Sequence, residues 1–248
     1  MNAEVALRSV LVTARKDIRI YYRKAPVWIF GLLLPLFLFL AFFIGRELDM
    51  RVYFPGFLAM SLFFTASSVG PLIIPWEKQA GTFERLLSYP VSLSTLIIGD
   101  IIAGALFGIL ISLIIVSIGV AFLAIEATSA VMLLVFFVAG NVCFAALGTL
   151  ISAFSGRTPS NTMMLSSLVR FPLIFISGIF VPLGQMQGAG ALLAYASPLT
   201  YLVDGFNSSL GESSFVSVSI SILALALYSC LFFVLTLFLL RRNLMKGL

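Results

Sequence analysis

Runs of apolar residues long enough to cross a membrane recur along the chain, and short polar segments separate them. An α-helix rises about 1.5 Å per residue, so about twenty apolar residues cross a hydrocarbon layer about 30 Å thick. The pattern predicts a transmembrane helix in each of six stretches: residues 27–44, 53–74, 95–125, 131–154, 160–182 and 215–240.

These stretches are expected to be helices rather than strands. Only helices and closed barrels satisfy every backbone hydrogen bond in lipid. Barrel strands would show segments of about ten residues in which apolar and polar side chains alternate. Residues 32–43 and 231–240 show no such alternation. The expected fold class is therefore an all-α integral membrane protein with six transmembrane helices, in which residues 1–248 form one transmembrane domain.

Residues 1–25 show a different pattern, in which apolar and basic side chains occupy neighbouring faces of one helix. On a helical wheel the apolar face spans an arc of about 120°. It contains Ala3, Leu7, Val10, Leu11, Ala14, Ile18, Tyr21 and Tyr22, and the adjacent face contains Arg8, Arg15, Lys16, Arg19 and Arg23. A helix of this kind lies in the plane of a membrane, where each cation gains on the order of 1 kcal/mol near an anionic surface. A solvated helix that precedes the first span is the alternative interpretation.

Composition and the placement of basic residues support a membrane protein and indicate its orientation. Hydrophobic residues make up 61% of the chain and charged residues 10%, whereas about one-quarter of a typical soluble domain is charged. Twelve Lys and Arg residues lie in or beside four segments: before the first span, at 77–94, near 157 and after the sixth span. Only Arg46 and Arg51 lie in the alternate segments. Because cytoplasmic loops carry the excess of Lys and Arg, we expect both termini to be cytoplasmic in the plasma membrane.

The chain offers little chemistry of its own. It has no histidine, and Cys143 and Cys230 both fall inside apolar stretches, so the usual ligands for zinc, haem or an iron–sulfur cluster are missing. The phosphate-binding pattern G-x-x-x-x-G-K-[ST] is absent, and Ser-Gly-Arg-Thr at 155–158 lacks its upstream glycine and its lysine. We therefore expect no catalytic, cofactor-binding or metal-binding residue, and ATP would be handled by a partner.

Two motifs resemble the membrane subunits of one class of ATP-binding cassette (ABC) exporter. The first is EKQAGTFERLL at residues 77–87, followed by PVS at 90–92. The second is SGIFVP at 177–182 with SPLTYLVD at 197–204. Together with six spans, internal termini and an amphipathic N-terminal helix, they make nearly the whole chain similar to the ABC-2 type permease family.

The resemblance implies an assembly and a division of labour. A permease of this family pairs with a second permease subunit, here expected to be a copy of itself, and binds two ABC ATPase subunits on the cytoplasmic side. No nucleic acid is expected among its partners. Residues 1–25 would be the cytoplasmic interfacial helix, residues 76–94 the cytoplasmic coupling segment, and residues 183–207 an external re-entrant segment. The last stretch is glycine-rich, too interrupted to span and too apolar for an ordinary loop.

Five residues of the coupling segment are expected, by this resemblance, to contact the ATPase. They are Glu77, Gly81, Thr82, Glu84 and Arg85. An amphipathic segment can present charged side chains to a partner while Phe83, Leu86 and Leu87 hold it against the spans. The alternative is a solvated loop whose charges are incidental.

Arg170 is the one basic residue well inside a predicted span, on the order of 15 Å beyond the cap expected at Ser160. An unpaired cation at such depth costs at least about 2.5 kcal/mol, so a partner or a wet cavity is expected. Asp100 enters the third span from the same side, at a position where family members often carry a basic residue after the glycine. One interpretation is an Asp100–Arg170 ion pair. The other is that Arg170 lines the route and meets an anionic or polar substrate.

The function expected from the residues and the resemblance is that of a permease subunit of an ATP-driven exporter for a lipid-like, drug-like or glycan-linked substrate. The alternative is an ATP-independent channel or secondary transporter. Such a protein would rely on several charges inside the membrane, whereas only Arg170 is predicted to lie deep and Asp100 less so.

Overall fold

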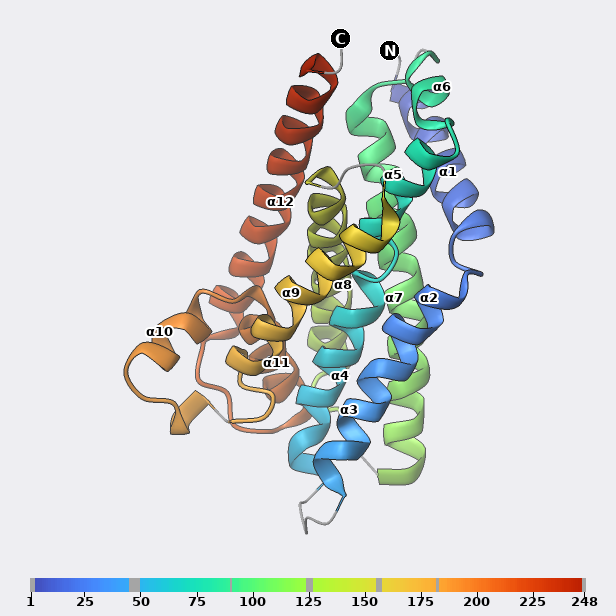
Figure 1. Cartoon of the computed structure of the whole chain (residues 1–248). Helices are drawn as coiled ribbons and strands as arrows, with labels where there is room; N and C mark the ends of the chain where they lie inside the picture. Colours follow the sequence, from blue (N-terminus) through green and yellow to red (C-terminus); the bar gives the residue numbers. More distant parts are fainter. Residues whose placement is uncertain are drawn as a thin grey trace.

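The computed structural model describes residues 3–44, 50–89, 91–123, 127–154, 158–181 and 183–246. In these ranges all regular elements are helices (Figure 1). The first half contains α1 (Ala3–Ile20), α2 (Ala25–Trp28), the π-helical η1 (Ile29–Leu33), α3 (Leu34–Phe43), α4 (Met50–Ala66), α5 (Gly70–Gln79), α6 (Phe83–Leu87) and α7 (Leu93–Leu123). The second half contains α8 (Ala130–Ala153), α9 (Pro159–Ile176), the 3₁₀ turn η2 (Leu183–Gln185), α10 (Ala189–Tyr195), α11 (Pro198–Leu210) and α12 (Val218–Lys246). The predicted all-α class is confirmed for these ranges.

Four stretches of helix are long and apolar enough to cross a membrane. They are Val52–Gln79, Leu93–Ala121, Ala130–Ala153 and Val218–Met245, and they correspond to the second, third, fourth and sixth predicted spans. The first predicted span is helical but is divided among α2, η1 and α3, and its apolar part, Ala25–Leu38, is shorter. The fifth predicted span is α9, which carries Arg170 and an internal proline, Pro172. Six spans therefore remain a prediction.

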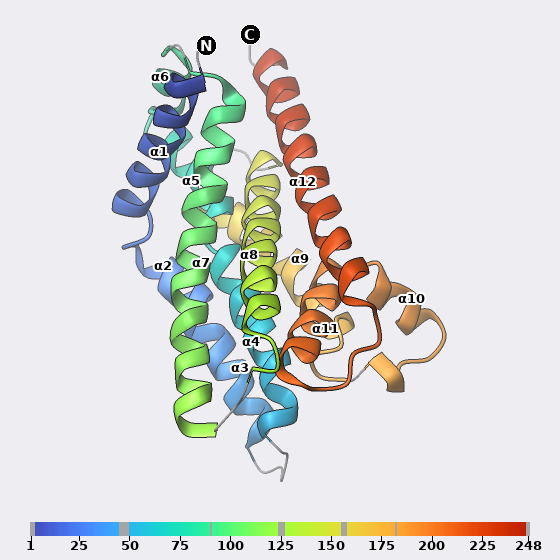
Figure 2. The same ribbon diagram turned by 180° about the vertical axis from the view of Figure 1, so that it is seen from behind.

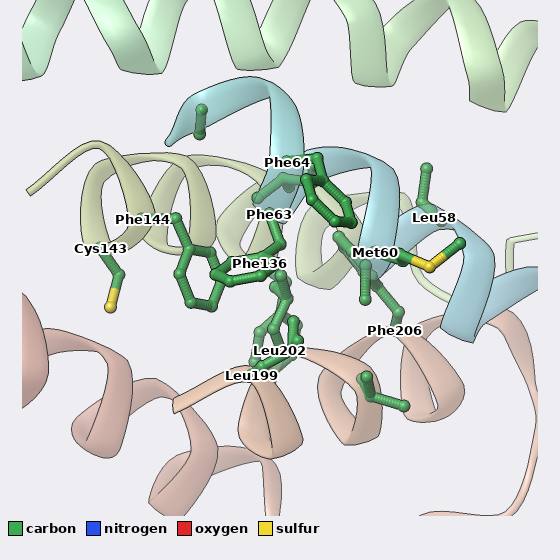
Figure 3. Close-up of a cluster of buried hydrophobic side chains, with 14 of the residues drawn as sticks. Leu58, Met60, Phe63, Phe64, Phe136, Cys143, Phe144, Leu199, Leu202 and Phe206 are labelled. Carbon is green, nitrogen blue, oxygen red and sulfur yellow. The ribbon is translucent and has the colours of Figure 1, made fainter. Parts of the chain in front are cut away.

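Helix α8 lies at the centre of the bundle, in contact with α4, α5, α7, α11 and α12. Figure 3 shows the aromatic core that joins three of these helices. Phe63 of α4 packs edge-on against Phe144 of α8, with ring centroids 4.8 Å apart. Phe206 of α11 packs against Phe137 of α8 at 5.2 Å. The core therefore fixes α4 and α11 on α8, whereas much of the apolar surface of α12 stays exposed.

Helices α10 and α11 form a compact unit beside the start of α12. Ser197 caps α11 by accepting a hydrogen bond from the Leu199 amide at 3.3 Å. The buried carboxylate of Asp204 accepts hydrogen bonds from the amides of Phe215 at 2.7 Å and Val216 at 3.1 Å. Since these amides lie just before α12, the carboxylate ties α11 to the start of that helix. The polar residues of the SPLTYLVD motif thus explain how α11 is held in place.

Both chain ends and α6 lie at one end of the bundle, and α10 and α11 lie toward the other, as the two opposite views show (Figures 1 and 2). Helix α1 runs alongside α7 at the first of these ends. Its side chains that face the protein are Val10, Thr13, Ala14 and Asp17, and Tyr21 and Tyr22 in the turn directly after it are also buried. Leu7, Leu11 and Ile18, which were expected on the same apolar face, are exposed instead. An in-plane position of α1 in a membrane stays a prediction.

Candidate functional site

The coupling segment begins at a sharp turn that ends α5. Gly81 has a φ of 66°, a left-handed conformation that glycine adopts without steric penalty. Its amide donates to the carbonyl of Lys78 at 3.3 Å, and the Thr82 amide donates to the carbonyl of Glu77 at 2.9 Å. These two bonds are the Schellman arrangement that closes a helix C-terminus. Gly81 and Thr82 therefore set the direction in which the chain leaves α5.

Helix α6 is held against the bundle on one face and presents charges on the other. Phe83 is buried in an apolar cluster with Ile74, Ile97 and Leu240. Glu84 and Arg85 are exposed. This is the arrangement expected of a segment that contacts a partner.

A groove of about 620 Å³ lies between the end of α1 and the α5–α6 turn. Its lining residues include Lys16, Tyr21, Lys24, Trp76, Thr82, Arg85 and Tyr89. The rings of Tyr21 and Trp76 are stacked with their centroids 5.4 Å apart, and the ammonium of Lys24 lies 3.8 Å from the centre of the Trp76 ring. Cation–π contact of this kind holds the end of α1 beside α5. The groove is thus partly formed by α1, which sequence reasoning had not included in the coupling site.

Glu77 points inward rather than to solvent. Its side chain is buried and accepts a hydrogen bond from the ammonium of Lys16, and the hydroxyl of Tyr21 donates to the same oxygen at 3.4 Å. These contacts join α5 to α1. Of the five residues expected to contact the ATPase, Glu84 and Arg85 are exposed, whereas Glu77, Gly81 and Thr82 shape the turn and its attachment. Their contact with an ATPase stays a prediction.

Glu77 belongs to a buried cluster of charged residues. The ammonium of Lys16 is also 3.0 Å from a carboxylate oxygen of Asp17, and the carboxyl groups of Asp17 and Asp100 are within hydrogen-bonding reach of each other. Burial raises the pKa of Asp17 above its usual range, and the contacts with Asp100 and Lys16 only partly offset this. Burial lowers the pKa of Lys16, but the carboxylates of Asp17 and Glu77 outweigh it and leave that pKa above its ordinary value.

The structure does not form the proposed Asp100–Arg170 pair. Asp100 contacts Asp17 near the start of α7, beside the point where Gly99 packs against Thr13 of α1. Arg170 lies on α9, which packs against α5 and α8. The pairing interpretation was wrong because it compared depth along two helices without knowing which faces they turn toward each other.

Arg170 instead contacts a break between α4 and α5. Its Nη2 donates to the carbonyl of Ser67. In a regular helix the amide four residues later would donate to that carbonyl, but this residue is Pro71, which has no N–H. The guanidinium also lies 6.0 Å from the centre of the Phe64 ring. Arg170 therefore satisfies the carbonyl that Pro71 leaves without its donor, and the position of Pro71 was the sequence signal that could have revealed this.

In the described ranges, no group of three His, Cys, Asp or Glu side chains is arranged to hold a metal ion. Long apolar helices around a buried aromatic core, with a charged short helix at one end, are the features of a multi-pass membrane protein.

The sequence model of the ABC-2 type transporter family matches residues 8–211, and the chain belongs to this family. The chain is also similar to the inner membrane transport permease YadH of Escherichia coli K12, with 24% identity over 157 residues, covering 63% of this chain. The same protein of Shigella flexneri matches equally. The matched part spans 61% of the length of these relatives.

Proposed function

We propose that this chain is the transmembrane permease subunit of an ATP-driven exporter, which forms the translocation route together with a second copy of itself. ATP is bound and hydrolysed on separate ABC ATPase subunits. The observation that supports this best is α6, whose charged residues Glu84 and Arg85 are exposed beside the groove at the end of the bundle where both chain termini lie. Family membership supports the same division of labour.

The attachment of α6 suits it to transmit movement. Phe83 anchors α6 in the apolar cluster around Ile97 and Leu240. The turn at Gly81 connects α6 directly to α5, and α5 packs against α8 in the centre of the bundle. A partner that displaces α6 would therefore act on the core through a short and well-packed connection.

The proposed topology follows the distribution of basic residues. The termini and residues 76–94 are cytoplasmic, and the protein lies in the plasma membrane. The first and fifth spans are formed by α2–η1–α3 and by α9. The segment with α10 and α11 is external and re-entrant, which agrees with its distance from the end that holds both termini.

Co-purification tests the proposal. The permease is co-expressed with a P-loop ATPase encoded beside it, and the pair is purified through a tag on the permease. Wild-type permease should retain the ATPase. The double variant Glu84→Ala/Arg85→Ala should insert normally and lose most of it, because the exposed charges that contact the partner are gone.

A matched control removes two other charges from the same end. Arg241→Ala/Arg242→Ala changes exposed residues of α12 and should leave co-purification unchanged. Equal loss in both double variants would show non-specific attraction rather than docking on α6. Substrate movement into liposomes by permease without any ATPase would instead favour the channel or secondary transporter.

A further inference from the structure

Three carboxyl groups and one ammonium are buried together where α1, α5 and α7 meet. Asp17 is 0%, Glu77 4% and Asp100 6% exposed. Lys16 is the only cation among the described residues that contacts them. If all four groups were ionised, the cluster would carry two uncompensated negative charges, and burying such charges is strongly unfavourable.

The single cation cannot serve all three carboxylates. Lys16 donates to Glu77, and Tyr21 donates to the same carboxylate. Lys16 also lies 3.0 Å from one oxygen of Asp17, but no donor among the described residues is aligned to form a hydrogen bond with either oxygen. The group facing Asp17 is the carboxyl of Asp100. Two carboxyl groups hydrogen-bond to each other only when one of them carries a proton.

The surroundings supply no other charge that could replace this proton. Among the described residues, the titratable groups facing the two carboxyls are Lys16 from α1, Tyr21 and Tyr22 from the turn after it, and Glu77 from α5. The hydroxyl of Tyr22 is buried without a hydrogen-bond partner in the described part of the chain. The side chains that α6, α7 and α12 add around the adjoining small cavity are apolar apart from Asp100 itself: Phe83, Leu86, Leu93, Leu96, Ile97 and Leu240.

We propose that Asp17 and Asp100 form a proton-binding site, in which one shared proton holds α1 against α7. Loss of the proton places two like charges in contact at the interface between these helices and weakens the docking of α1. The site makes the attachment of the N-terminal helix depend on pH, and this holds whether or not the exporter assignment is correct.

The contact between Asp17 and Asp100 lies where it can control the docking of α1 on α7. Helix α1 packs against α7, and next to the carboxyl pair a side-chain atom on Gly99 would lie 2.6 Å from Thr13, so the two backbones approach closely. The outward apolar residues Leu7, Leu11 and Ile18 add nothing to this face. The pair therefore lies beside a close approach of the two helices, where repulsion is poorly screened because both carboxyls are buried.

The direction of the effect follows from burial. Because burial raises the pKa of Asp17, the pair keeps its proton at pH values at which a free aspartate, with a pKa of about 3.9, has lost it. Docking of α1 is then complete at pH values below the pKa of a free aspartate, about 3.9, and weakens as the pH rises above it. In the pH range where only the docked form holds the proton, the equilibrium constant for docking of α1 falls about tenfold for each pH unit.

Tryptophan fluorescence of the purified permease, without any ATPase, tests the site. In a Trp28→Phe background, Trp76 is the single tryptophan. It stacks on Tyr21, the residue directly after α1, so its emission reports docking. Titration from about pH 4 to about pH 9 brackets the ordinary carboxyl range and the raised one. The Trp28→Phe protein with both aspartates intact should show a change in Trp76 emission as the pH rises. Asp17→Asn and Asp100→Asn, whose amides imitate the protonated carboxyl, should each keep the low-pH signal throughout.

The control and the opposing outcomes are defined by the same titration. Glu4→Gln removes an exposed carboxyl of α1 and should keep the transition. A transition that persists unchanged in both Asn variants would come from Lys24 or Tyr21 and would overturn the proposal. Emission that does not change with pH in the protein with both aspartates intact would also overturn it. If the Asn variants fail to fold, infrared difference spectra of the wild-type decide. The carbonyl band of a protonated carboxyl must disappear over the same pH range as the fluorescence change. If no such band is lost, the proposal is overturned.

Discussion

Arg170 of α9 donates a hydrogen bond to the carbonyl of Ser67, the one carbonyl of the α4–α5 break that Pro71 deprives of its helical donor. The side chain of Arg170 is almost completely buried, and no carboxylate pairs with it in the described ranges. A long side chain from one helix thus completes the backbone of another, and α9 is attached to the second span by this contact.

This relationship predicts coupling between Arg170 and Pro71. Arg170→Met should lower the free energy of unfolding by about 1–3 kcal/mol, because a buried carbonyl loses its donor. In a Pro71→Ala background the residue at 71 regains an N–H that can bond to Ser67, so the same substitution should cost about 1 kcal/mol less. Thermal unfolding of the four purified proteins in detergent measures the cycle. Equal effects of Arg170→Met in both backgrounds would contradict this role.

Asp100 and Arg170 should behave independently. Because the two side chains have different partners, the effects of Arg170→Gln and Asp100→Asn on thermal stability should add within about 0.5 kcal/mol. Asp17→Asn and Asp100→Asn should not add, since either one alone removes the like-charge contact. If the Arg170→Gln/Asp100→Asn double variant were instead more stable than the sum of the two single effects predicts, the result would support an Asp100–Arg170 ion pair, which the structure does not form.

Gly81→Ala should destabilise the turn before α6. A side-chain atom at this position would meet nothing within 4 Å, so the effect comes from the left-handed backbone alone and should amount to about 1–2 kcal/mol. Gly81→Asn should be milder, since asparagine tolerates this conformation. Thermal unfolding and ATPase co-purification should rank the proteins in the same order. An alanine variant as stable as wild type would show that the turn is not constrained.

Gly70→Ala should separate α5 from α8. The added Cβ would lie 2.8 Å from the backbone carbon of Gly148, and a backbone atom cannot move aside as a flexible side chain can. We expect a loss of about 1–3 kcal/mol from overpacking. Gly190→Ala is the control, because its Cβ would meet nothing within 4 Å and should leave the melting temperature unchanged. Similar effects at both positions would show that the close crossing is absent.

The topology predicts that Gln187 is reached from outside the cell. Gln187 is exposed in the segment before α10, so a cysteine there should react with an impermeant thiol reagent added to whole cells. The exposed Cys230 is first replaced by serine, and the buried Cys143 can stay. Labelling that needs permeabilised cells would place this segment on the cytoplasmic side.

Long apolar helices were the most predictable part of the fold. The starts and ends of α7, α8 and α12 lie within a few residues of the predicted spans, with α12 continuing further at its end. The first predicted span was less regular than expected. Residues 27–44 are uniformly apolar, and this hides the π-helical turn at Ile29–Leu33, which depends on local packing rather than on hydrophobicity.

Side-chain orientation was less predictable than the helices themselves. On α1 the wheel grouped Leu7, Leu11 and Ile18 with Val10 and Ala14, yet only the last two face α7. Apolar periodicity indicates which residues avoid water but not whether lipid or another helix covers them. For the same reason Asp17 went unnoticed, since a lone acidic residue in a basic helix gives no sign that it is buried against a second carboxyl.

Asp204 limits how the bundle can deform. Its carboxylate accepts hydrogen bonds from two amides just before α12, and these bonds tie the beginning of α12 to α11. Between α9 and α10 the chain turns at Gly178 and Gly188, which have φ values of 87° and 60°. A displacement of α11 would therefore reach α12 through the Asp204 carboxylate, whereas the two left-handed glycines before α10 lie outside this connection.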